Sequence, residues 1–73
     1  MANTIIDDPL DRARSALAAS PIYLLRQLDI NQVDGALYLS GRVDSFYHKQ
    51  LAQEVVRAVS GTLRVVNSVR VEG

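Results

Sequence analysis

The chain has 73 residues, which is enough for one domain and too short for a second hydrophobic core. Eight basic and eight acidic residues give a formal net charge of zero. The chain therefore lacks the broad positive field that nonspecific nucleic-acid binding requires, and we expect no nucleic-acid partner. The absence of cysteine excludes disulfides, thiolate nucleophiles and cysteine metal sites.

The N-terminal residues predict a flexible tail over 1–7, followed by a single domain over 8–73. The first eight residues contain two acidic residues and no basic residue, unlike a signal peptide. No apolar run is long enough to span a bilayer. As written, the sequence predicts a cytoplasmic protein, unless it was excised from a longer exported one.

A first helix is expected to begin at Asp8-Pro9, with Asp8 as the N-cap and Pro9 at the first helical position. Leu10, Ala13 and Leu17 then fall on one face. Ser20-Pro21 ends this helix, because a residue before proline is disfavoured in the α conformation.

A β-hairpin follows, with strands predicted over 25–32 and 36–43. Apolar and polar residues alternate on both sides of Asp34-Gly35, and an Asp-Gly pair tolerates the positive φ angles of a tight primed turn. Gly41 has a core-facing phase in the second strand, where it would leave room for a helix to approach.

A second helix is predicted over 46–59, capped by Asp44-Ser45. Apolar side chains form one stripe along it, and Gly61 is expected to take a left-handed conformation after its end. A third strand is predicted over 63–71. Gly35, Gly41, Gly61 and Asn67 are the residues we expect to have structural roles.

The predicted fold class is α+β, with element order αββαβ. A right-handed crossover makes the third strand parallel to the second, giving a three-stranded mixed sheet. Both helices should pack on one face of this sheet, because a hairpin alone is unstable in water. Either the first or the second strand can occupy the middle of the sheet, and the sequence leaves both orders open.

This order of elements resembles the BON domain family, named for bacterial osmotically induced periplasmic and nodulation proteins. The matching pieces are Leu17 with Ser20-Pro21, Leu28-x-Ile30, Asp34-Gly35-x-Leu37-x-Leu39-Ser40-Gly41-x-Val43, then Ser45, Ala52, Val55, Val59 and Gly61, and Val65-x-Asn67-x-Val69-x-Val71. They cover about residues 12–71. Thr62 and His48 depart from the family pattern at positions that affect packing and capping.

The resemblance implies an αββαβ module associated with bacterial envelopes and envelope stress, often periplasmic, with attachment to phospholipid frequently proposed. It supplies no catalytic residues. The resulting prediction is a noncatalytic, membrane-associated binding module whose partner is an anionic phospholipid surface or an envelope assembly. The alternative is a protein-interaction or self-association module that pairs with a protein partner, or a second copy, through an exposed sheet edge or face.

Two groups of side chains are candidates for binding. Arg42, Arg64 and Arg70, with Tyr38, are predicted on the open sheet face, where guanidinium groups can meet anionic headgroups. The alternative is an ordinary solvated face, with Asp29 and Glu72 as counter-charges.

The second group, Phe46 and Tyr47, lies at the outer end of the second helix, where aromatic rings can anchor to lipid headgroups or a protein. The alternative is that Phe46 packs against the preceding loop.

Catalysis is not expected. His48 is the only histidine, with Asp44 one helical turn before it, and one imidazole with one carboxylate falls short of a metal site. No serine has a spacing that places it beside His48, and no phosphate-binding glycine loop is present. We therefore predict no enzyme activity, no metal and no cofactor.

Overall fold

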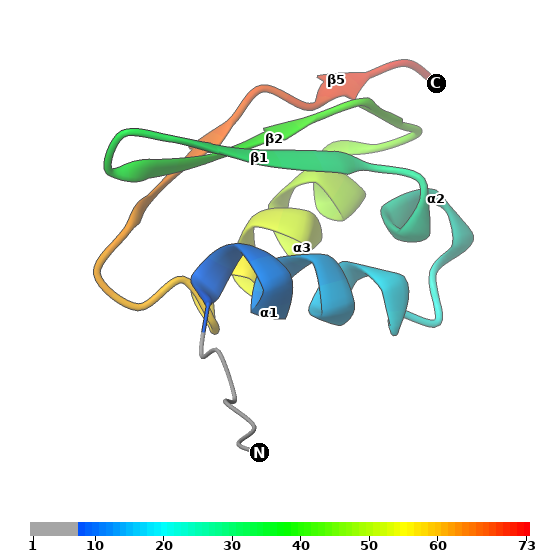
Figure 1. Ribbon diagram of the computed structural model, residues 1–73. Coiled ribbons are helices and arrows are strands. Elements are labelled where there is room, and N and C mark those ends of the chain that lie inside the picture. Colours follow the sequence, from blue (N-terminus) through cyan, green and yellow to red (C-terminus); the bar gives the residue numbers. More distant parts are fainter. Residues whose placement is uncertain (1–7) are drawn as a thin grey trace.

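The computed structural model describes residues 8–73, so the tail expected over 1–7 lies outside the described residues. A sheet forms one layer, and α1 and α3 form the other, packed against one face of the sheet (Figure 1). The predicted α+β class and the two helices on one face are confirmed. The order of elements is α1, α2, β1, β2, β3, α3, β4, β5.

Helix α1 (Pro9–Ala18) follows its sequence signals closely. Asp8 is the N-cap, and its side-chain oxygen accepts a hydrogen bond from the Leu10 N–H at 3.1 Å. Ala13 and Leu17 are buried, and Leu10 packs against the core from its margin. The predicted apolar face is therefore the one that contacts the rest of the fold.

A short helix, α2 (Tyr23–Arg26), lies where the first strand was expected to begin. The Ser20 hydroxyl accepts a hydrogen bond from the Ile22 N–H at 3.1 Å, which turns the chain into α2. The start predicted for the strand at residue 25 is wrong. The buried side chains of Leu25 and Leu28 are three positions apart, which is the spacing of a helix and not the alternation of a strand. Strand β1 covers Asp29–Val33.

The hairpin joins β1 to β2 (Ala36–Ser40) in antiparallel register, with Val33 opposite Ala36. Asp34 adopts a φ of 52°, whereas Gly35 does not take a positive φ. A Cβ at Gly35 would meet nothing within 4 Å. The turn therefore requires a left-handed conformation at residue 34, which aspartate tolerates better than most residues do.

Strand β2 is the middle strand, in the order β1-β2-β4. Strand β4 (Arg64–Asn67) runs parallel to β2, as the right-handed crossover predicts. Beyond them, β3 (Arg42–Val43) pairs in parallel with β5 (Arg70–Val71). The two long strands predicted over 36–43 and 63–71 are thus each divided, the first at Gly41 with a φ of 125°.

Helix α3 (Phe46–Arg57) ends two residues before the predicted position. Its Ala52 and Val56 are fully buried. Gly61 adopts the predicted left-handed conformation, with a φ of 64°. Gly41, by contrast, faces Leu28 and no helix, so the predicted reason for that glycine is wrong.

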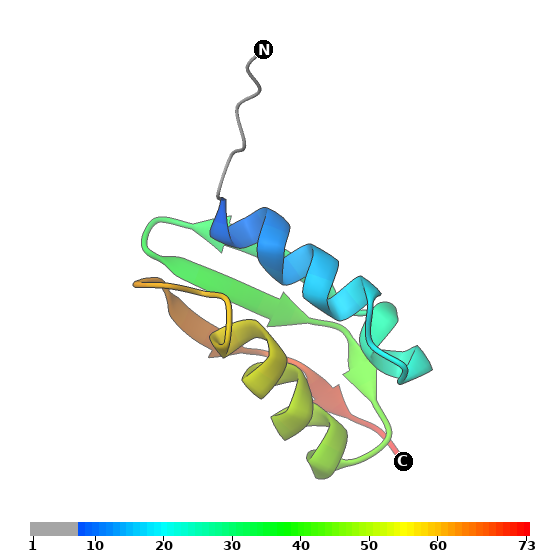
Figure 2. The same ribbon diagram turned by 90° about the horizontal axis from the view of Figure 1, so that it is seen from below.

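The core lies between the sheet and the helices. Figure 2 shows α1 and α3 side by side across one face of the sheet. The largest fully buried side chains come from α2, β2, α3 and the link between β4 and β5: Leu25, Leu37, Leu39, Val56 and Val69. Val43 of β3 belongs to the same buried cluster. The β3–β5 extension is therefore part of the same folded unit.

Replacing Ser45 by alanine should lower the free energy of unfolding by about 1 kcal/mol. The Ser45 hydroxyl accepts a hydrogen bond from the His48 N–H at 3.1 Å and satisfies one of the free donors at the start of α3. Urea denaturation followed by circular dichroism measures the change. Ser15→Ala, in the exposed middle of α1, is the matched control and should be neutral or slightly stabilising. Equal stability of the two variants would contradict the capping role.

Candidate functional site

Two arginines meet on the β3–β5 pair. Arg42 lies directly opposite Arg70 in the parallel register. The next residue on each strand, Val43 or Val71, packs into the core. Because successive side chains of a strand point to opposite faces, both guanidinium groups project from the face away from the helices.

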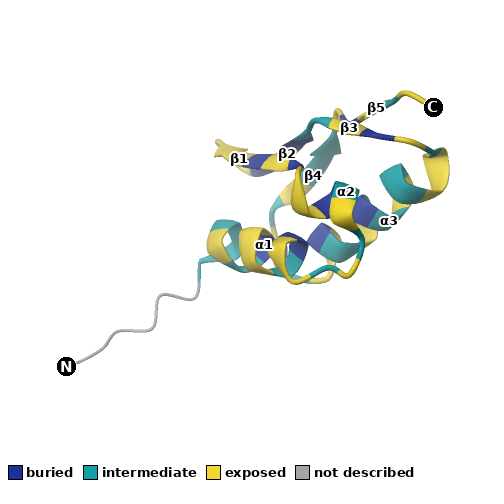
Figure 3. Cartoon of the chain, turned by 90° about the vertical axis from the view of Figure 1, so that its right-hand side faces the viewer, coloured by how far each residue is buried: buried dark blue, intermediate teal, exposed yellow. Residues whose placement is uncertain are grey.

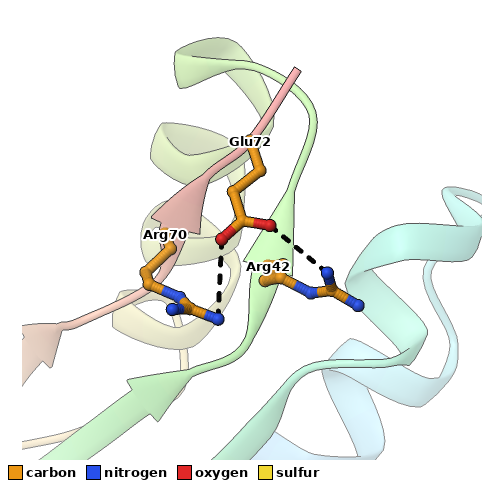
Figure 4. A network of polar contacts seen from close by, with 3 residues as sticks. All are labelled: Arg42, Arg70 and Glu72. Atoms are coloured by element: carbon orange, nitrogen blue, oxygen red, sulfur yellow. Dashed lines mark hydrogen bonds and ion pairs between the residues drawn. The ribbon is translucent and has the colours of Figure 1, made fainter.

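One carboxylate lies between the two arginines (Figure 4). Arg42 Nη1 lies 3.2 Å from Glu72 Oε1, and Arg70 Nη2 lies 3.5 Å from Glu72 Oε2. The side chains of Arg42 and Arg70 remain 67% and 70% exposed. Glu72 is the counter-charge that the sequence offered, and it leaves two cations facing solvent with one anion between them.

The other members of the predicted sheet-face group lie elsewhere. Arg64 is opposite Ala36, at the hairpin end of the sheet, and Tyr38 lies mid-sheet opposite Val66. Arg64 precedes Arg70 by six residues, or roughly 20 Å of extended chain. The structure therefore joins Arg42 with Arg70 and separates Arg64 from both.

The two aromatic residues at the start of α3 are exposed, Phe46 by 75% and Tyr47 by 69%. Phe46 therefore does not pack into the preceding loop, and its ring lies on the outer side of the helix. The Tyr47 ring contacts the His48 ring, with centroids 5.5 Å apart. Phe46 lines a groove together with Arg70 and Glu72, which brings the start of α3 close to one of the two arginines.

Tyr23 is a further exposed aromatic residue that sequence reasoning missed. It lies in α2, and the Arg26 guanidinium sits 5.5 Å from the centre of its ring. Tyr23, Arg42 and Glu72 line a shallow groove of about 490 Å³. The helical spacing of Leu24, Leu25 and Leu28 was the available signal that this segment is a helix and not a strand.

Helix α2, strands β3 and β5 and the start of α3 thus share one end of the molecule (Figure 2). Figure 3 shows that this end has much exposed surface around the buried core. We name it the arginine end, and it comprises Tyr23, Arg42, Phe46, Tyr47, Arg70 and Glu72.

The single histidine is part of a local helix contact. His48 Nδ1 lies 2.6 Å from Asp44 Oδ1, one turn earlier. Within residues 8–73 no serine hydroxyl bonds to this ring, and no three metal-ligating side chains gather. The one-turn spacing of Asp44 and His48 in the sequence thus brings the two side chains into contact.

The fold and the arginine end define a small α+β domain with exposed cationic and aromatic groups that suit noncovalent binding. The family model for the BON domain matches residues 11–73, so the chain belongs to the BON domain family. Domains of this family are generally noncatalytic binding modules. No curated protein was found to match the chain. No helix within residues 8–73 has the length and apolar character needed to cross a bilayer.

Proposed function

We propose that this BON domain attaches to anionic phospholipid surfaces at the bacterial envelope through its arginine end. The observation that carries the proposal is the side-by-side placement of Arg42 and Arg70 around Glu72, with the exposed Phe46 lining the same groove as Arg70 and Glu72. Cationic groups next to aromatic rings are the combination that membrane interfaces favour. Membership in a family associated with phospholipid binding supports the same choice.

The contact with Glu72 leaves the guanidinium groups available to a phosphate. Both ion pairs are exposed, and exposed pairs contribute only about 0–1 kcal/mol. A phosphate oxygen offers the same acceptor geometry with more charge, and Arg binds it in a bidentate manner. A headgroup can therefore replace Glu72 at little cost.

Changing Arg42 and Arg70 together to glutamine should weaken binding to anionic vesicles about 30-fold, because each cation near a charged surface contributes about 1 kcal/mol. The measurement is cosedimentation with phosphatidylglycerol-containing vesicles at low and moderate salt. Binding should weaken as salt shortens the Debye length.

Three further variants locate the contact. Arg64→Gln, at the far end of the sheet, is the charge-matched control and should lose much less vesicle binding. Glu72→Gln should increase binding, because it removes the competing carboxylate. Phe46→Ser with Tyr47→Ser should reduce binding that remains at moderate salt. If Arg64→Gln lost as much vesicle binding as Arg42→Gln or Arg70→Gln alone, the result would contradict the proposed site.

A further inference from the structure

The outer edge of the β4–β5 segment has unused backbone hydrogen-bonding groups. The N–H groups of Arg64, Ser68, Arg70 and Glu72 donate inward, at 2.8 to 3.0 Å, to the carbonyls of Gly35, Leu39, Gly41 and Val43 respectively. Since backbone groups of successive strand residues point to opposite sides, those of Val65, Asn67 and Val71 point outward. Strand β4 is the last strand of the sheet, and β5 pairs with β3 alone among residues 8–73.

A groove in two parts follows this edge, interrupted at Asn67, whose side chain donates to the Lys49 carbonyl and to Gln53 Oε1 of α3. One part, of about 420 Å³, is lined by Gln53, Arg57 and Val65 with their neighbours. The other, of about 500 Å³, is lined by Phe46, Lys49 and Val71 with their neighbours. Its helical wall consists of residues 46, 49, 53 and 57, which share one face of α3 because they are three or four residues apart. From Val65 to Val71 the edge spans roughly 20 Å, the length of an ordinary strand.

The walls of this groove are predominantly cationic. Four of the residues that line it are Lys49, Arg57, Arg64 and Arg70, against the single carboxylate of Glu72. Lys49, Arg57 and Arg64 form no ion pair with any residue of the described part, 8–73. Glu72 is already engaged by Arg42 and Arg70. A chain entering the groove is therefore favoured when it carries negative charge.

The edge has two features that natural proteins use against strand addition, the charged side chains of Arg64 and Arg70 and the short strand β5, but it lacks others. Natural edges are blocked by proline, by lysine within the strand or by a covering segment. Here Val65, Val66 and Val71 stand along the edge, half-buried, and no proline is present. Strand addition uses such free backbone groups for affinity and side-chain pockets for specificity.

We propose that the β4–β5 edge binds an extended, acidic segment of a partner protein, which adds as a strand in the groove between the edge and α3. The free backbone groups of Val65 and Asn67 bond to the added strand. Its acidic side chains face Lys49 and Arg57. This site adjoins the arginine end that we assign to phospholipid, and Phe46, Arg70 and Glu72 border both.

The first test uses a synthetic peptide of alternating glutamate and valine, with a lysine–valine peptide as the matched control. Titration calorimetry should detect binding of the glutamate peptide only. Amide hydrogen exchange should then show protection of the Val65 and Asn67 N–H groups. Protection confined to β1, or equal binding of both peptides, would overturn the proposal.

Two variants test backbone and charge separately. Val65→Pro removes an outward N–H without removing a bond to β2, and proline is tolerated at such edge positions. It should weaken glutamate-peptide binding about tenfold, the loss expected for one hydrogen bond. If this variant unfolds, Lys49→Glu with Arg57→Glu provides the second test, because it should reverse the preference between the two peptides. An unchanged preference in that variant would overturn the proposal.

Other occupants give distinct results. If Val65 and Asn67 become protected when the domain alone is concentrated, and sedimentation equilibrium shows a dimer, the occupant is a second copy and the acidic-partner assignment is overturned. If Lys49→Glu with Arg57→Glu abolishes vesicle binding as completely as the change of Arg42 and Arg70, the groove belongs to the lipid-binding surface, and the assignment to a protein is again overturned.

Discussion

Replacing Gly41 by valine should lower the free energy of unfolding by about 2–4 kcal/mol. Gly41 has a φ of 125°, which a β-branched residue adopts only with strain. A Cβ there would lie 2.8 Å from Leu28 Cδ2, so the Leu28 side chain must also shift. A chain of this length has a net stability of only a few kcal/mol. Urea denaturation followed by circular dichroism should therefore show a variant that is partly unfolded without denaturant.

Three alanine variants separate strain from steric contact. Gly41→Ala combines both effects. Gly61→Ala tests the strain of the positive φ of 64° alone, because a Cβ at Gly61 would meet only Arg12 Nη2 at 3.9 Å. Gly35 has neither a positive φ nor a neighbour within 4 Å, so Gly35→Ala should be nearly neutral. The expected order of stability is Gly35→Ala, then Gly61→Ala, then Gly41→Ala. A Gly41→Ala variant as stable as Gly61→Ala would show that Leu28 moves aside freely.

Features that depend on neighbouring residues were predictable from the sequence. The Asp8 cap with Pro9 gives the start of α1, and Ser45 gives the start of α3. Alternation around Asp34-Gly35 gives the hairpin, and the need for a right-handed crossover gives a third strand parallel to the second. In each case the physical cause acts within a few residues or follows from the chirality of the chain.

The features that the sequence did not predict depend on distant contacts. Gly41 takes its unusual φ where the chain passes Leu28, and this divides the second strand in a way that alternation alone does not show. The exception is the segment around Leu25, where the helical spacing of Leu24, Leu25 and Leu28 was a local signal for α2. Because the sequence predicted one continuous strand over 63–71, it placed Arg64 and Arg70 in the same group on the open sheet face.

The candidate site depends on the same long-range register. Only the parallel pairing of β3 with β5 places Arg42 beside Arg70, since 28 positions separate them in the chain. Each was identifiable as an exposed cation, but their pairing around Glu72 was not. The helical period puts Phe46 opposite the apolar stripe, and the structure exposes it, whereas the sequence left open the alternative that Phe46 packs against the preceding loop.

Replacing Asn67 by alanine should lower the free energy of unfolding by about 2–3 kcal/mol, a large effect for a residue without charge. Asn67 Nδ2 donates to the Lys49 carbonyl at 3.0 Å and to Gln53 Oε1 at 3.2 Å. Its Oδ1 accepts from the Val69 N–H at 3.1 Å. One side chain thus joins α3 to the link between β4 and β5.

Two companion variants divide this effect between the helix and the strand link. Gln53→Ala removes only one of the three contacts and should cost less than about 1 kcal/mol in urea denaturation. Asn67→Asp keeps an acceptor for the Val69 N–H but sets a carboxylate against the Lys49 carbonyl, so it should be at least as destabilising at neutral pH as Asn67→Ala. If Asn67→Asp matched the parent, the bond to α3 would contribute little, and the stabilisation would come from the Val69 contact alone.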